Sequence, residues 1–294
     1  MSVHFAFRFN KSEHLRSEES LDQEGRIFYP GTNGATVILV HGLTGSPRET
    51  GYLAQFLNRK GYTVLCPRLA NHGQPMNIFR KTRWQQMYES VRQAFLEREA
   101  AGDKTIFVSG LSVGALLALL LAHEFKGRVK GVSCLSPIFF FDGWNAPKLQ
   151  CLLPLGFYTP LKYYVFFKDG FPYGIKNETI RQRIHEYYDQ RTVHNLGDIT
   201  KNGYPFYPIA LLYQHHLLVK HLKPKIAQIQ TPVQIIQAQD DDMSSVKNAR
   251  HVHDSVSSQV KEIVLLQDSY HVIVADQERE KVARALQRFF DSLI

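Results

Sequence analysis

The sequence has few cysteines and no apolar run long enough to cross a bilayer. Its 294 residues include three cysteines, Cys66, Cys134 and Cys151, and no two have the spacing of zinc or redox motifs. The scatter predicts free thiols and no metal site. A strongly apolar stretch at residues 116–122 ends at a His-Glu pair. The first residues also lack the apolar segment of a secretion signal, so we expect a cytoplasmic protein without an integral membrane segment.

Long runs of one charge are also missing, although the formal net charge is +8. Basic residues such as Arg59, Lys60 and Arg98 are scattered, often beside acids such as Glu97 and Glu99. Nucleic-acid-binding surfaces usually cluster their Lys and Arg residues, so no nucleic-acid partner is expected. The hydrophobic (44%) and charged (21%) fractions are those of an ordinary globular protein, with one large α/β domain or two small ones.

Apolar, β-branched runs alternate with helix-length amphipathic segments, which is typical of a parallel sheet with crossover helices. Six strands are predicted, at residues 35–40, 62–66, 104–109, 129–135, 233–238 and 262–266. Four helices are predicted, at residues 47–60, 84–99, 113–125 and about 279–293. The fold class is therefore α/β, with a mostly parallel central sheet flanked by helices.

This alternation breaks between residues 137 and 225. The stretch is crowded with aromatic residues, among them Phe139, Phe140 and Trp144. An insertion of that length without secondary structure is rare inside a compact domain, so we expect short helices that form a cap over the sheet. The expected organisation is a core of residues 26–136 and 226–294, a cap or lid of residues 137–225, and a polar, flexible or loosely docked arm of residues 1–25.

The sharpest local signal is Gly110-Leu111-Ser112-Val113-Gly114, a G-x-S-x-G motif between a predicted strand and a predicted helix. A serine on such a turn projects from the C-terminal edge of the sheet, and the flanking glycines let strand and helix approach closely. The N-terminus of the following helix favours negative charge nearby. The alternative is a glycine-rich turn with an incidental serine, and the flanking strand and helix argue against it.

With this motif in its context, the chain resembles the α/β-hydrolase superfamily, and within it the carboxylesterase and monoacylglycerol-lipase-like branch, from about Ala35 to the C-terminus. The segment His41-Gly42-Leu43-Thr44-Gly45 resembles the oxyanion loop of that family. The resemblance implies an α/β-hydrolase fold with Ser112 as nucleophile. It also implies an oxyanion hole made by the backbone N–H groups of Leu43 and Val113. A plain turn is the alternative interpretation of His41-Gly42.

A serine is a poor nucleophile without a neighbouring base, and the chain offers 13 histidines. His271 follows the last predicted strand and precedes the last helix, at the same sheet edge as Ser112, and it resembles the histidine loop of the family. Three other histidines, His215, His216 and His221, are expected to be solvated or to pack in the cap. His251 and His253 are expected to lie on an exposed helix.

The acid that orients the base is expected between Ser112 and His271 in the sequence. The run Asp240-Asp241-Asp242 follows the predicted strand at residues 233–238. Three adjacent carboxylates leave the register open; similarity to the family points to Asp241, with Asp240 as the alternative. Asp142 is a weaker candidate, because some hydrolases place the acid after the fourth strand.

The resemblance implies a serine hydrolase that cleaves carboxylic esters, as a carboxylesterase or acylglycerol lipase, through an acyl-enzyme on Ser112. No cofactor or metal is expected. The first alternative is an acyl-thioesterase or acyltransferase acting on a carrier-bound chain, which the basic charge would suit because carriers are often acidic. The second is a non-catalytic binding protein on the same scaffold, against which a complete set of Ser, His and Asp argues.

The expected partner is a small acyl ester, and the substrate-binding residues come from the cap. Aromatic residues such as Phe139, Phe140 and Trp144 are candidates for an apolar acyl pocket, with the core of the cap itself as the alternative. Lysines interspersed with the aromatics are candidates for peripheral contact with an anionic headgroup or membrane surface: Lys162, Lys168 and Lys176.

Overall fold

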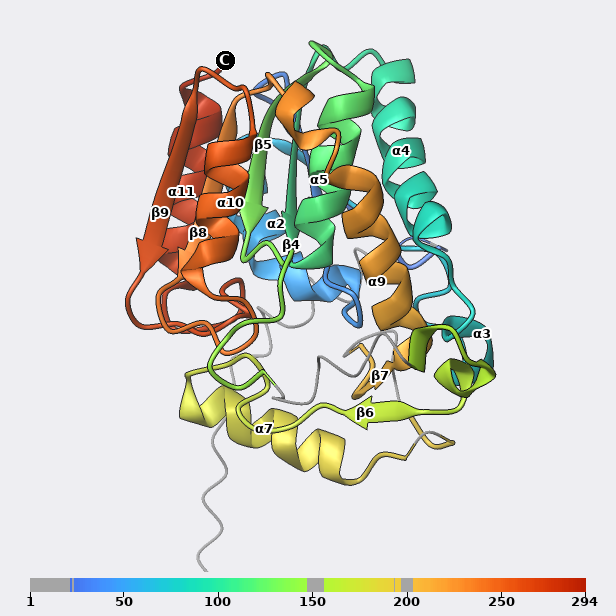
Figure 1. The fold of residues 1–294 in the computed structure, drawn as a ribbon. Helices are drawn as coiled ribbons and strands as arrows, with labels where there is room; N and C mark the ends of the chain where they lie inside the picture. Colours follow the sequence, from blue (N-terminus) through green and yellow to red (C-terminus); the bar gives the residue numbers. More distant parts are fainter. Residues whose placement is uncertain (1–21, 23, 147–155, 193, 197–202) are drawn as a thin grey trace, which may run out of the picture.

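The computed structural model describes residues 22, 24–146, 156–192, 194–196 and 203–294, which contain a seven-stranded sheet of order β1-β3-β2-β4-β5-β8-β9 (Figure 1). Neighbouring strands are parallel except β1 (Ile27–Tyr29), which pairs antiparallel with β3 (Thr63–Cys66). The other strands are β2 (Ala35–Val40), β4 (Thr105–Leu111), β5 (Val129–Leu135), β8 (Val233–Ala238) and β9 (Lys261–Leu266). The predicted mostly parallel architecture is confirmed.

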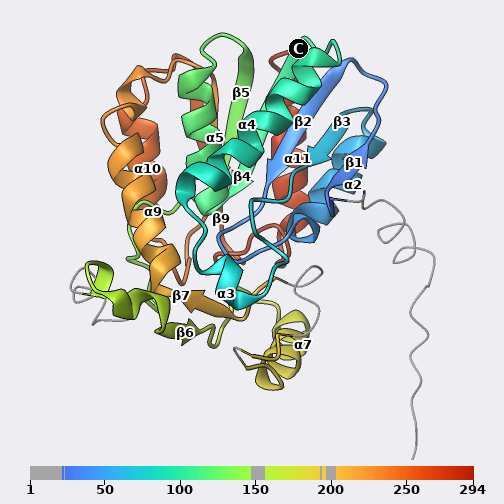
Figure 2. The ribbon, with the colours of Figure 1, turned by 90° about the vertical axis from the view of Figure 1, so that its right-hand side faces the viewer.

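Helices cover both faces of this sheet (Figures 1 and 2). Successive side chains of a strand point to opposite faces, so Val37 and Leu39 of β2 join one apolar cluster, whereas Ile38 and Val40 join the other. The first cluster includes α2 (Gly51–Arg59) and α11 (Arg279–Asp291). The second includes α4 (Trp84–Ala100), α5 (Val113–Glu124), α9 (Ile209–Leu222) and α10 (Val246–Ser255). Because the sheet is covered on both faces, its strands are apolar on both sides.

Helix α5 is apolar all round because it is enclosed on all sides. Its residues from Val113 to Ala122 are all buried, between the sheet and the neighbouring helices α4 and α9. Cys66 and Cys134 are likewise buried and free, as predicted, whereas Cys151 lies outside the described residues. Within the part of the chain that the structure describes, no helix has the length and apolar character needed to span a membrane.

The described part of residues 137–225 contains three kinds of element. The helical segments η3 (Pro160–Tyr163) and α7 (Glu178–Asp189) are the first kind. The longer helix α9 is the second, and it packs against α4 and α5. A two-stranded antiparallel sheet of β6 (Phe166–Lys168) and β7 (Phe206–Pro208) was not predicted. Helix α7 and both short strands lie beyond the C-terminal ends of the main strands (Figure 1). The stretch therefore lies over the sheet edge at which Ser112 was predicted.

Candidate active site

Ser112 lies on the tight turn between β4 and α5, in a backbone conformation that is rare for a residue with a side chain. Its φ is 57° and its ψ is −114°, and its N–H donates to the Leu135 carbonyl at 2.8 Å. A Cβ on Gly110 would lie 2.2 Å from the Gly114 carbonyl carbon, and one on Gly114 would lie 2.5 Å from the Val40 carbonyl oxygen. Both glycines are therefore needed for the close approach of strand and helix, as predicted from the motif.

This close approach predicts a large difference between two glycine-to-alanine variants. Gly114→Ala should lower the free energy of unfolding by about 1 to 3 kcal/mol, because the new methyl group meets the β2 backbone. Gly51→Ala is the matched control, since Gly51 is helical (φ −58°) and a Cβ there meets nothing within 4 Å; its effect should stay within about 1 kcal/mol. Urea unfolding followed by circular dichroism measures both, and equal losses would contradict this account of the turn.

The structure brings Ser112, His271 and Asp241 into one hydrogen-bonded row. His271 Nε2 lies 3.0 Å from Ser112 Oγ, and His271 Nδ1 lies 3.0 and 3.1 Å from the two carboxylate oxygens of Asp241. His271 and Asp241 are buried, and Ser112 is only 9% exposed. Ser112, His271 and Asp241 follow the C-terminal ends of β4, β9 and β8. The structure therefore brings them together at one edge of the sheet, where they were predicted to lie.

The Asp241 carboxylate is held by further hydrogen bonds. One oxygen accepts the N–H groups of Met243 and Ser244 at 2.8 and 2.7 Å, and the other accepts Gln237 Nε2 at 2.7 Å. Such donors fix the orientation of the carboxylate. Of the three adjacent carboxylates, Asp241 is therefore the one that faces the His271 ring.

The other acid candidates have different positions. Asp240 is exposed, and its carboxylate is 3.8 Å from Lys176 Nζ. Asp142 accepts the N–H and hydroxyl of Ser245 at 2.9 and 2.7 Å, so it holds the residue whose own hydroxyl caps α10. Asp242 accepts the His271 backbone N–H at 3.1 Å and supports the loop rather than the ring. Neither Asp240 nor Asp142 is brought to His271.

The pKa of His271 is shifted by opposing causes. Burial alone would lower it, but the Asp241 carboxylate, followed by Asp242 and Glu49, raises it above the ordinary histidine value. An imidazole with a raised pKa is a stronger base once it is neutral.

Neither the Leu43 N–H nor the Val113 N–H donates a hydrogen bond to another described residue. Val113 is the first residue of α5, where an N–H has no acceptor within its own helix. Leu43 lies in the loop after β2. The groups predicted as the oxyanion hole are thus available as donors.

The side chains of His41 and His72 contact the backbone of the loop that contains Leu43. The ring Nε2 of His41 accepts the Leu69 N–H at 3.2 Å, so its Nδ1 carries the proton and donates to the Gly42 carbonyl at 2.9 Å. His72 Nε2 lies 2.8 Å from the Leu43 carbonyl. Burial lowers the pKa of both histidines, which keeps the rings neutral. Buried contacts of this kind are not typical of a plain turn, the alternative interpretation of His41-Gly42.

Sequence reasoning missed His72 and Glu49. Glu49 lies in η1 (Pro47–Thr50), and its carboxylate accepts the Gly42 N–H at 2.7 Å. The spacing Ser46-x-x-Glu49 is that of a helix capping box and would assign the carboxylate to the N–H of Ser46. Only the three-dimensional fold shows that it turns to the Gly42 loop instead.

The aromatic and histidine candidates of residues 137–225 are spread over different environments. Phe139 is buried in the main core, which favours the structural alternative for it. Phe140 and Trp144 are 43% and 57% exposed, and Trp144 packs on Tyr270, the neighbour of His271. His251 is half-buried against Phe139 and Phe140, and His253 is also half-buried, so neither is as exposed as the predicted exposed helix implied.

The remaining histidines and the lysine candidates have ordinary surroundings. His215 is buried, lies 2.7 Å from the Ile138 carbonyl and has its pKa lowered to about 4 by burial. His216 and His221 are exposed, and half-buried His253 pairs with Asp254. The three lysines have partners within the chain: Lys162 over the Tyr213 ring, Lys168 with Asp189, and Lys176 with Asp268 and Asp240.

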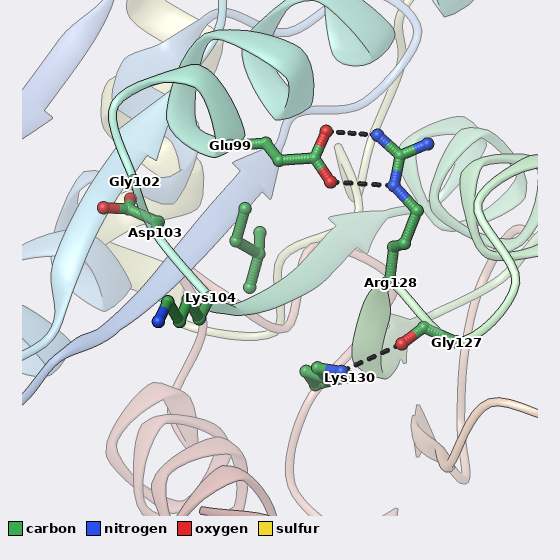
Figure 3. A pocket seen from close by; sticks show the side chains of 8 residues that line it. Glu99, Gly102, Asp103, Lys104, Gly127, Arg128 and Lys130 are labelled. Carbon is green, nitrogen blue, oxygen red and sulfur yellow. Dashed lines mark hydrogen bonds and ion pairs between the residues drawn. The ribbon is translucent and has the colours of Figure 1, made fainter.

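A cavity of about 340 Å³ lies at the opposite end of β4 from Ser112 (Figure 3). Several of its charged groups have partners: Arg128 pairs with Glu99, Asp103 pairs with Arg98, and Lys130 Nζ donates to the Gly127 carbonyl at 2.9 Å. It is lined by Glu99, Gly102, Asp103, Lys104, Ile106, Gly127, Arg128 and Lys130. It is separate from the Ser112 site.

Comparison with known proteins gives consistent matches over nearly the whole chain. The family Hydrolase_4, described as serine aminopeptidase S33, matches residues 31–278. The thermostable monoacylglycerol lipase of Bacillus sp. (strain H-257) is 28% identical over 265 residues, which is 90% of this chain and 93% of that protein. The carboxylesterase of Bacillus subtilis (strain 168) is 24% identical over 258 residues, covering 87% and 92%.

Solved structures show the same fold at lower identity. The crystal structure of the monoacylglycerol lipase from Paleococcus ferrophilus has a TM-score of 0.71 at 19% identity, covering 92% of this chain and 98% of that one. A structure from a study of the metagenome-derived lipolytic enzymes LipS and LipT has a TM-score of 0.74 at 22% identity, covering 92% and 99%.

Proposed function

Because the chain belongs to the Hydrolase_4 family of α/β-hydrolases, we propose that it is a carboxylic-ester hydrolase that forms an acyl-enzyme on Ser112. The observation that carries the proposal is the unbroken row of hydrogen bonds from Asp241 through His271 to Ser112. The relatives are a monoacylglycerol lipase and a carboxylesterase, which supports an acylglycerol or another small carboxylic ester as substrate.

In the first half-reaction, Ser112 Oγ attacks the ester carbonyl carbon while His271 Nε2 takes the hydroxyl proton. The carbonyl electron pair moves onto the oxygen, which accepts hydrogen bonds from the Leu43 and Val113 N–H groups. Each such donor contributes roughly 3 kcal/mol to the transition state. The electron pair then returns, the bond to the alcohol oxygen breaks, and His271 delivers its proton to the departing alcohol.

The second half-reaction repeats these steps with water. His271, neutral again, takes a proton from a water molecule that attacks the acyl carbonyl, and the same two N–H groups receive the oxyanion. Collapse breaks the bond to Ser112 Oγ, which regains its proton from His271, and the carboxylic acid leaves. Throughout both halves Asp241 keeps the His271 ring oriented and stabilises its positive charge.

The raised pKa of His271 gives a testable pH dependence. Ester hydrolysis needs the neutral ring, so kcat/KM should fall as the pH drops through that pKa, with a midpoint above the ordinary histidine value of about 6.5. A pH profile with a p-nitrophenyl ester measures the midpoint. A midpoint clearly below that of free histidine would contradict the assignment of His271, with its three neighbouring carboxylates, as the base.

The ester assignment can be tested directly against its alternatives. Purified protein is given p-nitrophenyl esters of graded chain length, a monoacylglycerol, an acyl-thioester and an amino-acid p-nitroanilide, and its labelling by a fluorophosphonate is followed by mass spectrometry. We expect the esters to give the highest kcat/KM and the label to add once, at Ser112. Faster turnover of the thioester or anilide would assign another reaction, and absence of labelling would support a binding protein.

A further inference from the structure

Glu49 places a carboxylate against the backbone of the loop that carries Leu43. Its Oε2 accepts the Gly42 N–H at 2.7 Å. Glu49 lies in the short helix η1, whose backbone is held by two hydrogen bonds. The Glu49 N–H donates to the Ser46 carbonyl at 2.9 Å, and the Thr50 hydroxyl donates to the Pro47 carbonyl at 3.0 Å. These bonds fix the backbone position from which the Glu49 side chain reaches the loop.

The loop is shaped to receive this carboxylate. A Cβ on Gly45 would lie 2.4 Å from Glu49 Oε2 and 2.8 Å from its Cδ, which is closer than real contacts allow. A Cβ on Gly42 would touch the same oxygen at 3.4 Å. The two glycines of the loop therefore leave the space that the Glu49 carboxylate fills.

Other groups fix the carbonyls of the same loop. The Gly42 carbonyl accepts the Gly45 N–H at 3.2 Å as well as His41 Nδ1, and the Thr44 carbonyl accepts the Tyr204 N–H at 2.7 Å. With the Gly42 N–H taken by Glu49, the Leu43 N–H remains without a partner among the described residues. None of these restraints uses the Leu43 N–H.

We propose that Glu49 is a positioning residue of the oxyanion loop, whose hydrogen bond to Gly42 holds the Leu43 N–H in the direction of the developing oxyanion. The inference rests on the proposed ester hydrolysis at Ser112. An oxyanion donor acts only if it is oriented before the reaction. Without Glu49, the buried Gly42 N–H would lose its acceptor, and a glycine peptide would turn at little cost to find another.

The carboxylate of Glu49 also acts through its charge, in two opposite directions. The titratable groups that face it are His271, Tyr188 of α7 and Tyr207 of β7. A negative charge there raises the pKa of His271, yet it also repels the oxyanion. Burial raises the pKa of Glu49 itself, although the Gly42 hydrogen bond and His271 oppose this. Its hydrogen bond and its charge therefore need separate variants.

Glu49→Gln keeps an acceptor for the Gly42 N–H and removes the charge, whereas Glu49→Ala removes both. For p-nitrophenyl butyrate, we expect Glu49→Ala to lower kcat by about 10- to 100-fold with little change in KM, since a misplaced donor costs less than the 10²–10³ of a deleted one. Glu49→Gln should stay within about threefold of wild type, with the acidic limb of its pH profile at lower pH. Glu280→Gln, an exposed carboxylate of α11, is the matched control.

The affinity for an alkyl trifluoromethyl ketone gives a readout that a merely structural role would not change. Ser112 adds to this ketone, so its oxygen becomes an oxyanion in the same hole while the Ser112 proton goes to His271. We expect Glu49→Ala to weaken its inhibition constant by the same factor as kcat, and Glu49→Gln to keep it. Thermal unfolding shows whether each variant is folded.

Two results would overturn the proposal. One is a Glu49→Ala protein with kcat and ketone affinity within twofold of wild type, and the other is a Glu49→Gln protein that loses as much as Glu49→Ala. Should Glu49→Ala not fold, Glu49→Asp replaces it, because its carboxylate is one methylene too short for Gly42. A wild-type protein that hydrolyses no ester would instead refute the proposed function, so the two failures are distinguishable.

Discussion

Ser112→Ala is expected to lower kcat for ester hydrolysis by about 10⁴- to 10⁶-fold, the range seen when a serine hydrolase loses its nucleophile. The Ser112 hydroxyl is the group that His271 Nε2 contacts at 3.0 Å, and alanine offers nothing to acylate. The backbone strain at φ 57° is already present with a serine Cβ, so the substitution should not unfold the chain. Steady-state kinetics, intact-mass analysis after fluorophosphonate treatment and thermal unfolding together test this.

Ser109→Ala is the matched control. Ser109 lies three residues earlier on β4, is fully buried, and its hydroxyl has no hydrogen-bond partner within the part of the chain that the structure describes. Exchanging it for alanine removes a buried, unpaired hydroxyl, so activity and stability should both be kept or slightly improved. We expect the kcat of Ser112→Ala to fall far below about one hundredth of the wild-type value. A larger residual kcat would mean that another residue acts as the nucleophile.

The main strands could be predicted from sequence because burial on both faces makes central strands such as β2 and β8 nearly continuous apolar runs. The six predicted strands correspond to β2, β3, β4, β5, β8 and β9, with ends that differ by at most two residues. β1 was missed because three residues at the edge of the sheet give no periodicity. The same holds for β6 and β7, whose pairing depends on contacts between residues about 40 positions apart, such as Phe166 and Pro208.

The candidate site divides in a similar way. Ser112 and His271 could be selected because each lies in a loop whose place at the sheet edge follows from the order of strands and helices. The spacing of the residues alone did not decide between Asp240 and Asp241, because a shift of one residue turns a carboxylate from solvent to the ring. The resemblance to the family pointed to Asp241, which is the residue that faces His271. Glu49 was missed for a related reason, since local spacing assigns it to a helix start rather than to Gly42.

The acid register yields the other prediction with a large effect. Asp241→Asn should lower kcat by about 10⁴-fold, because an amide can donate to His271 Nδ1 and stabilise the tautomer that has no proton acceptor facing Ser112. In either orientation the amide nitrogen would also oppose a donor, because the Met243 and Ser244 N–H groups donate to one Asp241 oxygen and Gln237 Nε2 donates to the other. The raised pKa of His271 should fall as well, which the pH profile of the residual activity would show.

Asp240→Asn and Asp142→Asn are the control variants for Asp241→Asn. Asp240 is exposed, so its variant should keep kcat within about twofold, as substitutions away from reacting groups usually do. Asp142 holds Ser245, the N-cap of α10, so its variant should lose about 0.5–2 kcal/mol of stability rather than turnover. If Asp240→Asn or Asp142→Asn abolished turnover and Asp241→Asn did not, the assignment of Asp241 as the acid that orients His271 would be wrong.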